Sequence, residues 1–173
     1  MRTAKKTKTL AFVGIAASVA LLLSYIEFLT PPVFAAVPGI KLGLPNIIIL
    51  YVLYAIGPKH AAFVSFSRLC ISTLLFGNVM MLAYSAAGAA LSLAVMILLK
   101  KTGRFSSVGV SVAGGVSHNL GQVLVAMLLL DTPEILYYMI VLTVTGTLSG
   151  IFIGLCGGLL VSRIPPSKIL LKN

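Results

Sequence analysis

The feature that most constrains this chain is a series of apolar runs long enough to cross a membrane. A membrane-spanning helix needs about 20 mainly apolar residues, and the sequence contains six candidate runs, at residues 9–29, 44–56, 61–76, 79–99, 108–130 and 135–161. Charged residues make up only 9% of the chain, against about 25% in soluble domains. We therefore predict an all-α, polytopic integral membrane protein whose 173 residues form one domain, a six-helix transmembrane bundle.

The second and third runs are short, and helix-breaking residues bound them. "LPN" precedes the second run and "GPK" separates the two. They are predicted either as a hairpin of tilted helices or with the second run partly re-entrant. The first run follows a basic segment, as in a signal peptide, but its length favours a retained first span.

The positions of the charges predict the topology. With six spans, every basic residue except Lys41 and Arg68 falls on one side, while Glu27, Asp131 and Glu134 fall at the opposite ends of the spans. Cytoplasmic loops are enriched in Lys and Arg. We therefore expect a multi-pass protein of the bacterial cell membrane whose basic termini, residues 1–8 and 164–173, are both cytoplasmic. The net charge of +10 then reflects topology and attraction to anionic lipid, and a nucleic-acid partner is not expected.

Motifs for intrinsic catalysis are missing from the sequence. With only three acidic residues, the chain has no DDxxD pair for magnesium diphosphates, and it contains neither a phosphate-binding GxxxxGK[ST] loop nor an HExxH zinc motif. Cys70 and Cys156 are far apart and are expected to be buried free thiols. We predict no enzymatic activity, no cofactor and no metal site.

Polar residues at membrane depth are the candidates for a binding site. Counting about 1.5 Å per helical residue places Arg68, in "SFSRLCIS", and His118, in "VSHNLGQV", near the middle of the bilayer. Gln122 shares a helix face with His118, and Asn119 is adjacent. Arginine suits the recognition of carboxylate or phosphate, so an anionic or strongly polar ligand is predicted between the third and fifth spans. The alternative is that these side chains only stabilise packing.

Other residues suggest packing or docking. Gly146, Gly150, Gly154 and Gly158 recur every four residues in the last run and predict close helix packing within the chain, with partner contact as the alternative. Ala16 and Ala20 form a similar small pair in the first run. Asn78 is a further candidate ligand-binding amide, although a helix cap or turn is the alternative for it and for Asn46. The Pro- and Gly-rich loop at residues 30–44 is long enough to be functional.

Three motifs together resemble a known family. "KLGLPN", "SRL" followed by "LLFG", and "SHNLGQ" are similar to the bacterial Gx transporter family, also labelled heptaprenyl diphosphate synthase component I, over roughly residues 8–163. That family in turn resembles the substrate-binding S components of energy-coupling factor (ECF) transporters.

The resemblance implies a six-helix subunit that captures a vitamin, cofactor precursor or isoprenoid-related molecule, with ATP hydrolysis by separate subunits. By this analogy the loop at residues 30–44 is a lid. Ala16 and Ala20 dock a transmembrane coupling subunit, and the substrate-binding positions are Arg68, Asn78, His118, Asn119 and Gln122.

Two other functions remain open. The synthase label implies a non-catalytic membrane component of heptaprenyl diphosphate synthase, acting with a soluble prenyltransferase in isoprenoid or menaquinone side-chain synthesis. A solitary channel or carrier is the third possibility, although no inverted repeat supports it. The ligand is not identified by the sequence.

Overall fold

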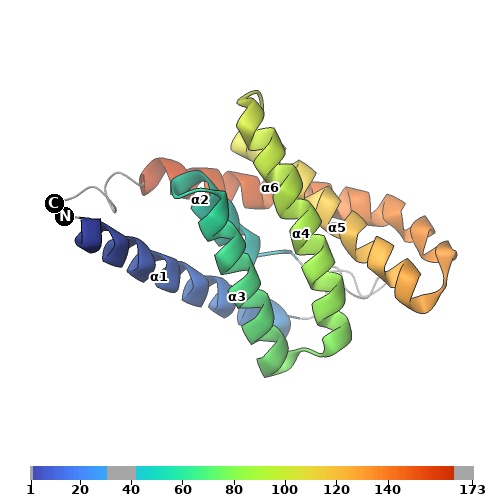
Figure 1. Cartoon of the computed structure of the whole chain (residues 1–173). Helices are drawn as coiled ribbons and strands as arrows, with labels where there is room; N and C mark the ends of the chain where they lie inside the picture. Colours follow the sequence, from blue (N-terminus) through green and yellow to red (C-terminus); the bar gives the residue numbers. More distant parts are fainter. Residues whose placement is uncertain (1, 31–41, 166–173) are drawn as a thin grey trace.

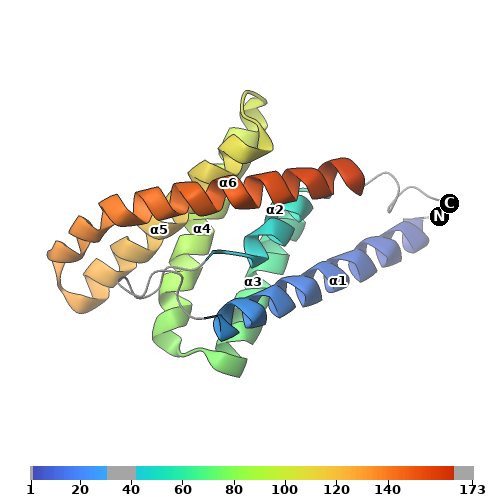
Figure 2. The ribbon, with the colours of Figure 1, turned by 180° about the vertical axis from the view of Figure 1, so that it is seen from behind.

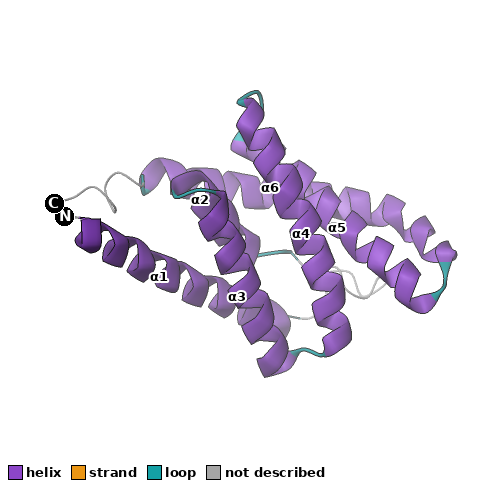
Figure 3. Ribbon diagram, viewed as in Figure 1, coloured by secondary structure: helices purple, strands orange, loops and turns teal. Residues whose placement is uncertain are grey.

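A computed structural model describes residues 2–30 and 42–165, and this part of the chain is entirely helical apart from its turns (Figures 1 and 3). Six α-helices and one short 3₁₀ helix, η1, follow in order: α1 Arg2–Leu29, α2 Pro45–Ala55, α3 Pro58–Phe76, α4 Val79–Thr102, α5 Ser107–Leu130, η1 Pro133–Tyr138 and α6 Met139–Arg163. The predicted all-α class and the six helices are confirmed. The predicted lid segment falls mostly on residues 31–41, outside the described residues.

The helix ends extend beyond the apolar runs where the flanking residues favour helix. α1 begins at Arg2 and α4 continues through Lys100 and Lys101, because lysine is a good helix former outside the membrane as well. Gly103 then ends α4 with a left-handed φ of 67°. Such a conformation suits glycine, which has no Cβ. The apolar runs therefore predict the helix cores better than the helix termini.

Within residues 2–30 and 42–165, four helical segments are long and apolar enough to cross a membrane: Lys6–Leu29, Val79–Thr102, Ser107–Leu130 and Pro133–Arg163. α2 has only 11 residues, about 16 Å of helix. α3 has 19 residues but carries Lys59, His60 and Arg68. The structure therefore supports a membrane protein, and full spans at α2 and α3 stay a prediction.

α2 is the most enclosed helix, although it is the shortest of the six. Leu50, Val52 and Leu53 are almost completely buried, and α2 packs against α1, α3 and α6. A helix that is apolar all round needs this degree of enclosure in a bundle interior. The short second run is therefore part of the protein core.

Contacts with α2 bring the basic ends of several helices together. The Tyr51 ring packs on Phe12, with 6.0 Å between ring centroids, and its hydroxyl donates a 2.9 Å hydrogen bond to the Ile164 carbonyl. Lys100 Nζ donates a 2.6 Å bond to the Leu53 carbonyl. The start of α1, the end of α4 and the end of α6 thus lie at one end of the bundle, and Figures 1 and 2 show α1 and α6 reaching toward the same side.

Four glycines of α6 face α5, and Gly157 faces Leu50 of α2 instead. A Cβ at Gly150 or Gly154 would lie 2.6 Å from a Cα atom of α5, and a Cβ at Gly146 would lie 2.8 Å from the Asn119 side chain. A Cβ at Gly158 would lie 2.7 Å from Ser107 Oγ. A Cβ at Gly115 of α5 would lie 2.5 Å from the Gly146 carbonyl oxygen. The predicted glycine contact within the chain is confirmed, because only glycine allows the two backbones to come this near.

Replacing Gly150 by Ala should therefore separate α5 from α6. The new methyl would lie 2.6 Å from Val112 Cα, and overpacking of this kind costs about 1–3 kcal/mol. The measurement is thermal unfolding of the purified protein in detergent. The matched control is Gly14→Ala, since no atom lies within 4 Å of that position. Equal melting temperatures for the two variants would contradict the close packing.

Candidate functional site

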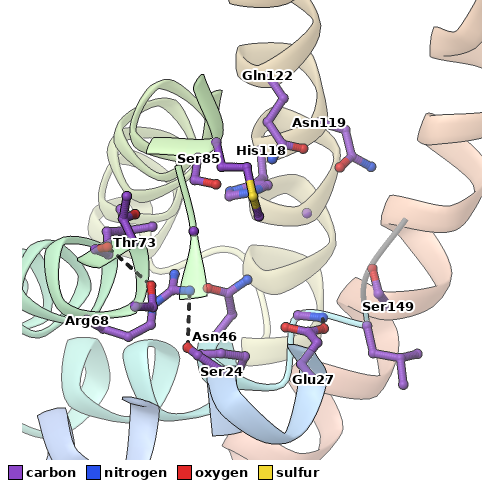
Figure 4. A pocket seen from close by; sticks show the side chains of 18 of the residues that line it. Ser24, Glu27, Asn46, Arg68, Thr73, Ser85, His118, Asn119, Gln122 and Ser149 are labelled. Carbon is purple, nitrogen blue, oxygen red and sulfur yellow. Dashed lines mark hydrogen bonds between the residues drawn. The ribbon is translucent and has the colours of Figure 1, made fainter. Parts of the chain in front are cut away.

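A cavity of about 130 Å³ lies among the six α-helices and has an unusually polar lining for an apolar bundle. Figure 4 shows its side chains gathered around a common space. The polar groups come from every α-helix: Ser24, Glu27, Asn46, Arg68, Ser72, Thr73, Ser85, His118, Asn119, Gln122 and Ser149. Since polar groups are costly in an apolar interior unless they are hydrogen-bonded, their concentration in one place makes this cavity the candidate site.

The cavity lies away from the basic end of the bundle. Its lining includes Glu27 near the end of α1, Pro45 at the start of α2, Gly77 after α3 and Met81 at the start of α4. Leu42 and Gly43, which precede α2, also line it. The Gly43 amide donates a hydrogen bond to the Glu27 carboxylate, so the chain returning to α2 is fixed to α1 beside the cavity.

Arg68 is held from the side of α1. Its Nη1 lies 3.5 Å from Ser24 Oγ, at the limit of a hydrogen bond, and its Nε is buried without a hydrogen-bond partner in the described part of the chain. The Glu27 carboxylate acts electrostatically on the guanidinium. A buried donor without an acceptor costs about 1–3 kcal/mol. Arg68 therefore offers an unused donor to an oxygen atom in the cavity.

Glu27 is the site residue that sequence reasoning missed. It was expected at the membrane rim, but it is only 9% exposed and lines the cavity with Arg68. Helical spacing carries the signal, because Ala20, Ser24 and Glu27 follow at intervals of four and three and therefore share one face. Ser85 and Ser149 were also missed, and Asn46 was weighed mainly as a cap or turn residue although it lines the cavity. No spacing in the sequence brings these three residues together.

Three predicted residues of α5 do meet Arg68 at the cavity. His118 packs against α4, where a Cβ at Gly88 would lie 3.0 Å from its Cε1, and it lies within electrostatic reach of Arg68. Asn119 Nδ2 donates a 2.6 Å bond to the Leu142 carbonyl of α6, and Gln122 completes this side of the lining. A Cβ at Gly88 would lie 2.8 Å from the His118 carbonyl oxygen. The absence of a side chain at Gly88 thus lets α5 approach α4 at the level of the cavity.

The other predicted site residues lie elsewhere. Asn78 caps α4, where its side chain accepts a 2.8 Å bond from the Met81 amide, and it is not part of the cavity lining. Ala16 and Ala20 are 6% and 0% exposed and pack in the hydrophobic core. A partner cannot reach these alanines while that packing is intact. The structure thus gives Asn78 a capping role and the alanines a packing role.

The arrangement supports recognition by hydrogen bonding. Arg68 and Glu27 carry opposite charges, and the remaining polar groups are hydroxyls, amides and an imidazole. No group of three or more His, Cys, Asp or Glu side chains that could hold a metal ion occurs in residues 2–30 and 42–165. Cys70 and Cys156 are free thiols.

The fold and the cavity define a helical membrane protein with a polar internal cavity. Residues 16–160 match the family described as heptaprenyl diphosphate synthase component I, and the chain therefore belongs to this family. Comparison with curated proteins and with solved structures gave no significant match.

Charge coupling between Glu27 and Arg68 can be tested with a double-mutant cycle. Glu27→Gln keeps an acceptor for the Gly43 amide but removes the charge, and Arg68→Gln removes the opposite charge. We expect a coupling free energy of about 1–3 kcal/mol in thermal or denaturant unfolding. The double variant should lose less stability than the sum of the single variants. Additive losses would show that the two charges do not interact.

Proposed function

We propose that this chain is the substrate-binding membrane subunit of an ECF-type uptake transporter and is similar to an S component. The observation that carries the proposal is Arg68, a buried cation with an unused donor that lines a polar cavity between apolar helices. Ionisable groups inside membrane bundles commonly mark ligand or ion sites. In this proposal the chain captures a small molecule and separate subunits hydrolyse ATP.

The orientation follows from the two ends of the bundle. Lys59, Lys100 and Arg163 belong to the basic end, and the positive-inside tendency assigns this end to the cytoplasm. The cavity is displaced toward the opposite end, which then faces outward. A ligand would enter from outside, near the segment that joins α1 to α2.

The size and charge of the cavity restrict the ligand. Its volume of about 130 Å³ is below the range of about 300–1,000 Å³ for drug-sized ligands. It therefore fits a small molecule or the polar part of a larger one. Arg68 suits a carboxylate or phosphate oxygen, while Glu27 balances its charge and favours a ligand with little net charge. Small vitamins, cofactor precursors and isoprenoid-related molecules with such a group remain candidates.

Docking of a coupling subunit is assigned to the exposed side of α1. Gly14 and Ser18 are four residues apart and exposed, and no side chain of the bundle lies within 4 Å of a Cβ built at Gly14. Small residues at this spacing allow close approach of another helix. This surface replaces the buried pair Ala16 and Ala20 as the proposed contact.

The family description favours a second candidate function. A heptaprenyl diphosphate synthase component would here be a non-catalytic membrane partner of a soluble prenyltransferase. The scarcity of acids supports the non-catalytic form, because the chain has only three, and magnesium–diphosphate chemistry uses clustered carboxylates. The two functions differ in their protein partners.

Purification with native partners distinguishes the two functions. The tagged chain, expressed in its native host and gently solubilised, should retain a transmembrane coupling subunit and two ATPases, identified by mass spectrometry. Gly14→Leu with Ser18→Leu should reduce their recovery severalfold without lowering the melting temperature, whereas Gly14→Ala should not. Recovery of a soluble prenyltransferase without transporter subunits would contradict the transport proposal.

Ligand retention tests the role of Arg68 separately. Small molecules extracted from the purified protein should include one that is lost from Arg68→Ala and strongly reduced in Arg68→Lys. Lysine keeps the charge opposite Glu27 but lacks the planar fork of donors. Arg104→Ala, at an exposed position outside the cavity, is the control. A molecule retained equally by all variants, or an Arg68→Lys protein that fails to insert, would favour a packing role.

A further inference from the structure

A second hollow lies between the N-terminal halves of α1 and α3, at the end of the molecule away from the polar cavity. It is a groove of about 670 Å³. Leu10, Val13 and Phe63 form its apolar walls, and Lys6, Lys59 and His60 lie beside them. Leu10 and Phe63 are 71% and 57% exposed, whereas Val13 forms a buried floor at 4%. The groove is therefore apolar inside and basic at one end.

The two helices present the same order of side chains to the groove. On α1, Lys6 precedes Leu10 by one turn, and on α3, Lys59 precedes Phe63 by one turn. Residues four apart share a helix face. Each wall thus has a cation nearer the start of its helix and an apolar side chain nearer the membrane interior. This order matches an amphiphile with an anionic head and a hydrocarbon chain.

The charged residues that line the groove, Lys6 and Lys59, are both basic. In the described part of the chain no acidic residue lines the groove. Glu27 lies at the other end of α1, while Asp131 and Glu134 belong to the turn after α5 and to η1. Anionic lipids of the cytoplasmic leaflet attract basic residues near the membrane surface.

We propose that this groove is a binding site for an anionic phospholipid. The phosphodiester lies between Lys6 and Lys59, and one acyl chain runs along Leu10, Val13 and Phe63. A free phosphate ion would use only the lysines and leave the apolar walls exposed, whereas a zwitterionic lipid would gain less from the two cations. The site is separate from the polar cavity and does not depend on the proposed transport function.

Lipid competition with the full-length protein tests the site. The purified chain is mixed with phosphatidylglycerol and phosphatidylcholine of identical acyl chains, and bound lipid is counted by native mass spectrometry. We expect preferential retention of phosphatidylglycerol. Lys6→Gln with Lys59→Gln should lower the ratio of bound phosphatidylglycerol to phosphatidylcholine about five- to twentyfold, since each lysine near an anionic surface accounts for up to about fivefold in affinity.

Two further variants make the result specific to the groove. Lys101→Gln with Arg104→Gln removes the same charge from exposed positions outside the groove and should leave the ratio unchanged. Phe63→Ser keeps all charges but removes an apolar wall and should reduce the retention of both lipids. An equal effect of both charge variants would show diffuse attraction and overturn the proposal. Displacement of the lipid by millimolar inorganic phosphate would overturn it as well, because the lysines would then form a phosphate site.

Discussion

The interaction on which the binding site depends is the burial of the Arg68 charge beside α1. A guanidinium inside an apolar bundle needs polar neighbours, because desolvating an unpaired charge costs far more than most packing contacts return. Ser24 and Glu27 supply these neighbours from one face of α1. Glu27 also accepts a hydrogen bond from Gly43. Arg68 therefore ties α3 to α1, and Glu27 ties α1 to the start of α2.

The opposite wall depends on backbone contact rather than charge. α5 approaches α4 at Gly88 and Gly121, and it approaches α6 at Gly115 and Gly146. Lipid tails are as apolar as leucine side chains, so helix association in membranes relies on such close packing. The hydrogen bond from Asn119 to the Leu142 carbonyl adds a polar link between α5 and α6. His118 and Gln122 are thus carried on a helix that is fixed on two sides, which suits a preformed site.

Sequence reasoning predicted the parts of the structure that repeat along a single helix. Apolar runs predicted the helices, and the four-residue glycine spacing predicted the close packing of α6. Depth counting brought Arg68 and His118 to the same cavity. Glu27 was predicted at the membrane rim because it lies near the end of an apolar run. Its side chain instead points inward, and that direction depends on the rotation of α1 about its own axis, which the run does not predict. The contact between Gly88 and His118 could not be predicted, because it requires knowing which helices are neighbours.

α1 connects every surface to which a function is assigned here. Lys6 and Leu10 line the basic groove, Gly14 and Ser18 are exposed, and Ser24 and Glu27 line the cavity. α1 packs mainly on α2 and α3, and so it lacks the glycine contacts that join α4, α5 and α6. A ligand oxygen that accepted from Arg68 Nε would use a donor that Ser24 does not occupy, since Ser24 lies at Nη1. Ligand binding and the link between α3 and α1 are therefore compatible at the same guanidinium.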